Sequence, residues 1–349
     1  MSPKRVTIKD IARELKISTS TVSRALADKW DVNPDTRKAV MELSEKLNYH
    51  PNRMSLSLKN QQSMAIGVII PEFINAFFPE VIMGIESVLL PKGYLILISQ
   101  SNESHENEIA NIKALENKMV DGFLISVSKD TCKPDFFNEL VERNIPVVFF
   151  NRMCPDIHSS AVLIDDRKWA RIATEHLIKQ GCKKIVHLAG PDNLVVSIER
   201  KNGYLDALKA HGIPVDESFI IPCGIVMEVG IMSAYKILEM SPRPDGIFAF
   251  NDPTAIGAMK TLQKEGLRIP EDIAIVGFSE SKMAVIVEPN LTSVEQPTFE
   301  IGKAAAEILL QQINSEKNQH EKKSDRTIIL DAKLNIRESS LLDREKGVR

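Results

Sequence analysis

The feature that most constrains this chain is a pair of short amphipathic helical patterns joined by a tight turn, between Thr7 and Leu26. The first pattern begins with Thr7 and Asp10 in the spacing of a capping box and ends at Leu15–Lys16. The second begins at Ser18, whose hydroxyl suits an N-cap. The apolar faces are Ile8, Ile11, Ala12 and Leu15 in the first pattern and Val22, Ala25 and Leu26 in the second. This spacing predicts a helix-turn-helix.

The polar face of the second helix carries side chains suited to contacting DNA: Thr19, Ser20, Ser23 and Arg24. Short hydroxyls and a guanidinium can reach base edges and phosphates when such a helix lies in a major groove. A third helix is predicted after Asn33, with Pro34 at its first position and Val40, Leu43 and Leu47 facing inward. The alternative is a helical hairpin whose Ser and Thr side chains only face water.

The charge distribution agrees with a polyanionic partner for the N-terminal segment. The net charge is only -3, but residues 1–60 hold 12 Lys and Arg against 7 Asp and Glu. The rest of the chain holds 32 basic and 40 acidic residues. A basic head on an acidic body favours nucleic acid as the partner of the head. By itself an excess of this size is also typical of an ordinary solvated surface.

From about residue 64, short β-rich runs alternate with amphipathic helical stretches. The runs are MAIGVII, YLILISQ, DGFLIS and PVVFFN, and then, after about residue 161, AVLID, KIVHLAG, GIFAF and AIVGF. This alternation predicts an α/β fold of parallel sheets in two similar lobes, with ligand space at the carboxyl ends of the strands. The expected domains are an all-α helix-turn-helix domain at 1–49, a linker with a short helix at 50–62, and a two-lobed domain at 63–349.

Several other classes of protein fit poorly. The chain lacks the Walker, GxGxxG, HExxH and GxSxG motifs, and its seven His and four Cys residues have no metal-ligand spacing. The pair Asp165 and Asp166 fits a helix cap near Arg167 better than a catalytic dyad. The longest apolar stretches have strand length, and the N-terminus has no apolar signal segment. We therefore expect a cytoplasmic protein that is not an enzyme and uses no cofactor or metal.

The segment from Thr7 to Leu26, continued by NPDTRKAVMELSEKLNYHPNRMSLSL, resembles the LacI/GalR family of bacterial transcription regulators. The resemblance extends through IPEFINAFF, VDGFLIS, PVVFFNR, HLAGP, FAFNDPTAIGAMK and DIAIVGF, nearly the length of the chain. It implies a homodimer that places each recognition helix in a major groove of a DNA operator and a hinge helix in the central minor groove. It also implies a two-lobed, periplasmic-binding-protein-like sensor for a small-molecule effector, a sugar or sugar derivative.

Roles in DNA binding carry over by position in this resemblance. Thr19 and Ser20 match the family's base-reading pair, Arg24 its major-groove arginine, and Thr7 and Ser18 its phosphate contacts. The hinge positions are Asn52, Met54, Ser55 and Leu58. Leu58 matches a leucine that the family wedges between base pairs, and its alternative role is packing on the sensor. Ser55 departs from the usual alanine.

The implied effector contacts lie at strand ends: Asn75, Phe77, Phe78, Asn151, Arg152, Arg200, Asn251, Ser279 and Gln296. Alternatives remain for some of them, since the phenylalanines can be core residues and Arg200 can form a surface ion pair. Asp252 can cap the next helix. Two positions depart from the family. Ser279 replaces a usual aspartate, for which Glu280 can substitute, and Ile198 replaces a common arginine.

The sequence therefore predicts a DNA-binding repressor whose operator affinity is controlled by an effector. The rival class is a solute receptor with the same two-lobed body, which would carry a signal peptide in place of residues 1–58. An enzyme ranks third.

Overall fold

The computed structural model describes residues 6–49, 62–74, 76–131, 133–317 and 325–342. The chain forms two compact units, residues 1–64 and 65–349. Five of the predicted site residues lie outside the described residues: Asn52, Met54, Ser55, Leu58 and Asn75.

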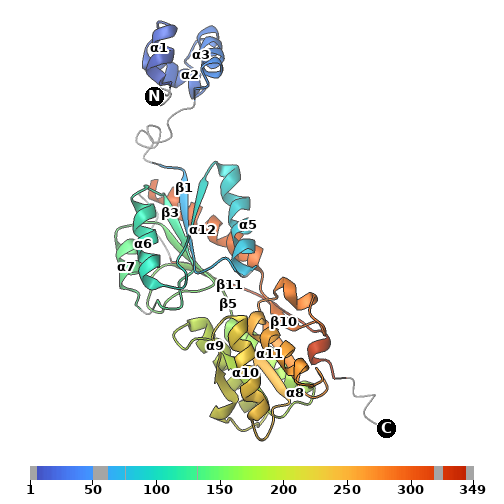
Figure 1. The fold of residues 1–349 in the computed structure, drawn as a ribbon. Helices are drawn as coiled ribbons and strands as arrows, with labels where there is room; N and C mark the ends of the chain where they lie inside the picture. The colour runs from blue at the N-terminus through green and yellow to red at the C-terminus, as the bar shows by residue number, and fades with distance from the viewer. Residues whose placement is uncertain (1–5, 50–61, 75, 132, 318–324, 343–349) are drawn as a thin grey trace. The chain divides into compact units, whose positions relative to one another are not determined.

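Within its described residues, the first unit contains three helices, α1 (Ile8–Glu14), α2 (Thr19–Leu26) and α3 (Pro34–Lys46) (Figure 1). The predicted helix starts are confirmed. The Ser18 hydroxyl accepts a hydrogen bond from the Thr21 N–H at 3.0 Å, and the Asn33 amide oxygen accepts one from the Asp35 N–H at 2.8 Å. The three helices bury one apolar cluster: Ile11, Ala12, Val22, Ala25, Val32, Val40 and Leu43. These caps and this cluster fix the orientation of α2.

The described residues of the second unit form two six-stranded sheets. The first sheet is parallel and has the strand order β11-β5-β4-β3-β1-β2. Its strands are β1 (Ala65–Ile70), β2 (Leu95–Gln100), β3 (Gly122–Ile125), β4 (Val147–Phe150), β5 (Ser160–Ile164) and β11 (Thr327–Leu330). Its helices are α5 (Phe77–Leu89), α6 (His105–Glu116), α7 (Asp135–Glu142), α12 (Thr298–Lys317) and the short η1 (Leu90–Lys92).

The second sheet has the order β12-β10-β9-β8-β6-β7 and is parallel except for the β10–β12 pair. Its strands are β6 (Ile185–Ala189), β7 (Ile220–Pro222), β8 (Gly246–Ala249), β9 (Ala274–Phe278), β10 (Thr292–Glu295) and β12 (Lys333–Asn335). Its helices are α8 (Asp166–Lys179), α9 (Val195–Ala210), α10 (Met227–Glu239) and α11 (Asp252–Lys264), with η2 (Glu217–Phe219), η3 (Lys282–Val285) and η4 (Glu338–Ser340).

The two-lobed α/β body is confirmed, but one strand was predicted in the wrong lobe. The AVLID segment forms β5, which pairs with β4 and β11 of the first sheet, so the second sheet begins at β6. The chain crosses between the sheets after β5, after β10 and between β11 and β12. Among the described residues, no helix is both long and apolar enough to span a membrane.

Helices α5 and α12 pack at very close range beside the first sheet. A Cβ atom added to Gly302 would lie 1.9 Å from the Val81 carbonyl oxygen, and one added to Gly84 would lie 2.0 Å from that of Phe299. Only glycine permits this approach of two backbones. The N-terminal ends of both helices, at Phe77 and Thr298, reach the same pocket between the lobes.

Candidate functional site

The outward face of α2 has the chemistry predicted for it. Thr19, Ser20 and Arg24 are exposed and Ser23 is half-buried, while Val22 and Ala25 lie in the helical core. The Ser20 hydroxyl lies 2.6 Å from that of Ser18. The hydroxyls of Ser18 and Ser20 are therefore hydrogen-bonded to each other at the start of α2.

The Arg24 guanidinium forms an ion pair with the Asp31 carboxylate, which the sequence analysis did not predict. The Arg24 side chain remains 53% exposed, so a DNA phosphate or guanine can compete for its donors. At the start of α1, the N–H and hydroxyl of Thr7 both donate to the Asp10 carboxylate, at 2.9 and 2.7 Å. This arrangement confirms the predicted partnership of Thr7 and Asp10 at the helix start.

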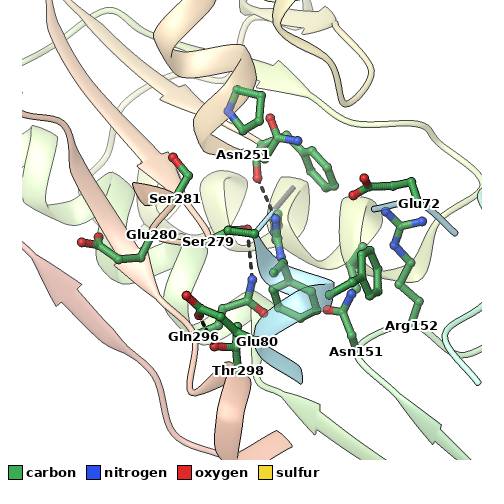
Figure 2. A pocket seen from close by; sticks show the side chains of 17 residues that line it. Glu72, Glu80, Asn151, Arg152, Asn251, Ser279, Glu280, Ser281, Gln296 and Thr298 are labelled. Atoms are coloured by element: carbon green, nitrogen blue, oxygen red, sulfur yellow. Dashed lines mark hydrogen bonds between the residues drawn. The ribbon is translucent and has the colours of Figure 1, made fainter. Parts of the chain in front are cut away.

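A pocket in the second unit lies between the two lobes (Figure 2). It collects side chains that follow strands of both sheets, side chains from the first turns of α5 and α9, and side chains from the segment that crosses from β10 to α12. All the predicted effector contacts within the described residues line it: Phe77, Phe78, Asn151, Arg152, Arg200, Asn251, Ser279 and Gln296. The structure thus brings these residues together, and their contact with an effector stays a prediction.

Arg200 lies within α9, not at a strand end as predicted, and in the wall of the pocket it is half of a buried ion pair. Its Nε donates to the Asp166 carboxylate at 2.7 Å and its Nη1 to the Phe250 carbonyl oxygen at 2.6 Å. The guanidinium lies 3.6 Å from the centroid of the Phe278 ring. Burial raises the pKa of the Asp166 carboxyl, and the Arg200 charge opposes that rise. The alternative of a surface ion pair is wrong, because Arg200 is only 3% exposed.

Arg152, from the opposite lobe, also has a carboxylate partner. Its Nη1 lies 3.0 and 3.1 Å from the two carboxylate oxygens of Glu103, and both side chains are nearly buried. The Arg152 guanidinium lies 6.0 Å from the ring centroid of Phe78, a buried residue. Glu103 was not predicted as a site residue, because it lies 49 residues from Arg152 in the sequence.

Ser279, which replaces the aspartate usual in the family that the sequence resembles, lies in the turn directly after β9. Ser279 and Glu280 both have positive φ, at 99° and 52°. The Ser279 hydroxyl accepts a hydrogen bond from the Gln296 amide at 3.0 Å. Glu280 is paired with Arg337, and Figure 2 shows its carboxylate directed away from the centre of the pocket. Glu280 therefore does not substitute for the family's aspartate in this arrangement.

The start of α11 is capped by Asn251, so the alternative of an Asp252 cap is wrong. The Asn251 amide oxygen accepts from the Thr254 N–H at 3.0 Å, and its NH₂ group donates to the Ile225 carbonyl at 2.8 Å. Asp252 is instead fully buried and accepts hydrogen bonds from the Ser293 hydroxyl and the Ser281 N–H. Asp165 is the cap of α8, as predicted, and accepts from the Lys168 N–H at 2.9 Å.

Asp252 gives the unfolding equilibrium a pH dependence. Burial raises the pKa of Asp252 to about 7, against opposing hydrogen bonds. An unfolded aspartate ionises near 3.9. Between these values the native state holds a proton that the unfolded state has lost, so this group's contribution to stability falls as pH rises from about 4 to about 7.

We expect Asp252→Asn to be more stable than the wild type at pH 8 and to lose the advantage at pH 4. The largest gain that the pKa shift allows is about 4 kcal/mol. Urea unfolding of both proteins at pH 4, 6 and 8 measures the difference. Other groups also titrate in this range, such as His187, because burial lowers its pKa to about 4. These groups are present in both proteins and therefore cancel in the comparison. If the free energies of unfolding of the two proteins differed by the same amount at all three pH values, the raised pKa of Asp252 would be contradicted.

Two family descriptions match the chain. Residues 7–52 match "Bacterial regulatory proteins, lacI family", and residues 63–338 match "Periplasmic binding proteins and sugar binding domain of LacI family". The chain belongs to the LacI family. It has the family's helix-turn-helix domain followed by the two-lobed α/β domain.

Relatives of this LacI-family chain match it over most of their length. The ribose operon repressor of Halalkalibacterium halodurans is 34% identical over 307 residues, 88% of this chain and 90% of that protein. The transcriptional repressor CytR of Escherichia coli strain K12 is 34% identical over 337 residues, 96% of each. The solved structure of the lac repressor dimer bound to operator and the anti-inducer ONPF has a TM-score of 0.85 at 25% identity, covering 97% of this chain and all of that one.

Proposed function

We propose that this LacI-family chain is a repressor that binds a DNA operator through α2 and whose operator affinity is set by an effector bound between the lobes. The observation that carries the proposal is the exposed Thr19, Ser20 and Arg24 face on a helix held in place by a buried apolar cluster. The pocket of the second unit supports the effector half. The names of the relatives, a ribose operon repressor and the lac repressor, agree with both halves.

In this proposal α2 enters the major groove, where Thr19, Ser20, Ser23 and Arg24 contact bases and Thr7 and Ser18 contact phosphates. The hinge residues Asn52, Met54, Ser55 and Leu58 belong to the proposal as minor-groove contacts. Asn75 belongs to it as an effector contact. The hinge residues and Asn75 lie outside the described residues, so their roles depend on the family resemblance alone.

A homodimer is part of the proposal, as in the operator-bound lac repressor. Exposed apolar side chains in the second unit offer a surface for a second copy. They lie on α5 and the edge strand β2, on α10, and on or beside η3: Met83, Leu95, Ile98, Ile231, Met232, Tyr235, Val285 and Ile286. Contiguous exposed apolar side chains are typical of protein interfaces, and we propose that these residues form such a surface. Two recognition helices could then meet successive major grooves, about 34 Å apart.

We further infer that the protein acts in the cytoplasm, where an operator is accessible, and that it has no catalytic role or cofactor. The relatives are transcription regulators. In the part of the chain that the structure describes, no cluster of three or more His, Cys, Asp and Glu residues could hold a metal ion. A solute receptor is disfavoured because the first unit is a helix-turn-helix.

We expect Arg24→Ala to weaken operator binding by about 1–3 kcal/mol, because a guanidinium that contacts a guanine edge contributes this much. The operator is first selected from a random duplex library with the full chain, and affinity is then measured by fluorescence anisotropy at several salt concentrations. Arg268→Ala, which removes an exposed arginine from the second unit, is the matched control. Equal affinities of the two variants, or no enriched sequence, would refute the proposal.

A further inference from the structure

The ion pair between Arg24 and Asp31 joins the last turn of α2 to the loop that follows it. The Arg24 guanidinium contacts the Asp31 carboxylate through Nη2. Among the described residues, neither Nε nor Nη1 of Arg24 has a hydrogen-bond or ion-pair partner. A guanidinium carries five N–H donors, so most of the donors of Arg24 remain available to a base edge or a phosphate.

The loop holds Asp31 in place from both sides. The Lys29 N–H donates to the carbonyl oxygen of Arg24 itself at 3.1 Å, and the Val32 N–H donates to the Lys29 carbonyl oxygen at 3.3 Å. Val32 is buried in the helical core, and the next residue, Asn33, caps α3. The Asp31 side chain is only 27% exposed. The fold of the first unit therefore fixes this carboxylate beside Arg24.

A carboxylate at this position opposes the binding of any duplex. In the proposed complex α2 lies in a major groove, so Asp31 approaches the DNA together with Arg24. It repels the phosphates and offsets the charge with which Arg24 would attract them. Partly exposed ion pairs add little to stability, so stability alone is a weak reason for this pair. Its larger effect is on what Arg24 contacts.

Pairing with Asp31 favours a guanine edge over a phosphate as the DNA partner of Arg24. A phosphate attracts an arginine mainly through charge, which the carboxylate offsets. Guanine O6 and N7 instead accept two parallel N–H bonds, which requires a correctly oriented guanidinium. One Nη2 hydrogen directed at Asp31 leaves the other Nη2 hydrogen and one on Nη1 for these two bonds. A fixed carboxylate also reduces the number of conformations that the long side chain loses on binding.

We infer that Asp31 is a positioning residue for sequence recognition, which directs Arg24 to a guanine and suppresses contacts between Arg24 and the phosphates of other sequences. The inference rests on the proposed function, since it assigns a role within the same DNA-binding surface. Specificity then arises in part from weakened binding to wrong sites. Asp31 itself acts only through Arg24.

The test compares Asp31→Asn with Asp28→Asn in the full chain. Asp28 belongs to the same loop, its side chain is 81% exposed, and it is paired with Arg37 and not with Arg24. Asparagine tolerates the positive φ of 51° at position 28. The two variants therefore remove the same charge three residues apart, and only one of them frees Arg24. Asp31→Ser removes the carboxylate with a different side chain and should behave as Asp31→Asn does.

Affinities are measured by fluorescence anisotropy for the selected operator, its single-base-pair variants and an unrelated duplex of the same length, at several salt concentrations. Compared with Asp28→Asn, Asp31→Asn should bind the unrelated duplex about threefold more tightly, and its preference for the operator should be about fivefold lower. For the unrelated duplex, the slope of log affinity against log salt should steepen by about 0.9, the value of one added phosphate contact. The lost base preference should fall on the guanine at which Arg24→Ala also loses its preference.

In an Arg24→Ala background, Asp31→Asn should change affinity no more than Asp28→Asn does, because its effect acts through Arg24. An effect that persists in this background, or equal changes in the two single variants, would overturn the inference. A merely structural role for Asp31 would lower both affinities together with the melting temperature, and that result would also overturn it. Failure of the proposed function differs from these outcomes: no sequence is enriched from the library, or Arg24→Ala leaves operator affinity unchanged.

Discussion

Replacing Asp166 by Ala should lower the free energy of unfolding of the second unit by about 3–5 kcal/mol. The substitution leaves the Arg200 guanidinium buried, with its Nε deprived of the carboxylate 2.7 Å away. The Phe250 carbonyl and two aromatic rings remain as partners, but none of them carries a compensating charge. An uncompensated buried charge is among the most destabilising defects that a single substitution can make.

Urea unfolding of the full chain, followed by far-ultraviolet circular dichroism, measures this loss. Asp206→Ala is the control, because it breaks the exposed ion pair with Arg167 and should change stability far less. The double variant Asp166→Ala/Arg200→Met should recover much of the loss, since it removes both charges. A single-variant loss no larger than that of the control would show that Asp166 does not compensate the charge of Arg200.

Val22→Asp should unfold the first unit and abolish operator binding. Val22 is completely buried at the centre of the cluster formed by α1, α2 and α3. Burying an unpaired carboxylate costs several kcal/mol, and a three-helix unit of this size has little stability to lose. The second unit has its own sheets and core and should remain folded.

In this variant, fluorescence anisotropy with the operator measures the function of the first unit. Limited proteolysis of the full chain shows which of the two units remains folded. Met41→Asp introduces the same charge at a position on α3 that is 44% exposed, and it should retain the fold. If Val22→Asp keeps its resistance to proteolysis in residues 6–49, the assignment of Val22 to the core is wrong.

Local sequence patterns predicted most helices and strands well, because helix caps and strand alternation depend on residues that are close in the sequence. Ser18 and Asn33 cap their helices as expected, and the β-rich runs form strands. The assignment of β5 failed for a physical reason. A strand belongs to the sheet with which it forms hydrogen bonds, and β5 pairs with β11, more than 160 residues away. The three-residue strands β7 and β12 are too short for a pattern to be evident.

The candidate pocket was predicted residue by residue, but its charge pairs were not. Arg152 follows β4, as predicted, but Arg200 lies within α9 and not at a strand end, and their partners Glu103 and Asp166 come from distant segments. Sequence spacing gives no information on such contacts, since only the fold brings them together. Asn251 and Asp252 are adjacent and equally suited to cap a helix, so only the structure distinguishes the cap from the buried acid.

Operator affinity of the full chain, measured by anisotropy with and without a saturating sugar identified by thermal-shift screening, tests the central claim most directly. If the pocket controls DNA binding, the sugar should change operator affinity by about 5- to 150-fold, and the operator should change sugar affinity by the same factor in calorimetry. Arg24→Ala should weaken operator binding while leaving sugar affinity in the absence of DNA unchanged. Operator affinity that is identical with the pocket empty and saturated would contradict the account.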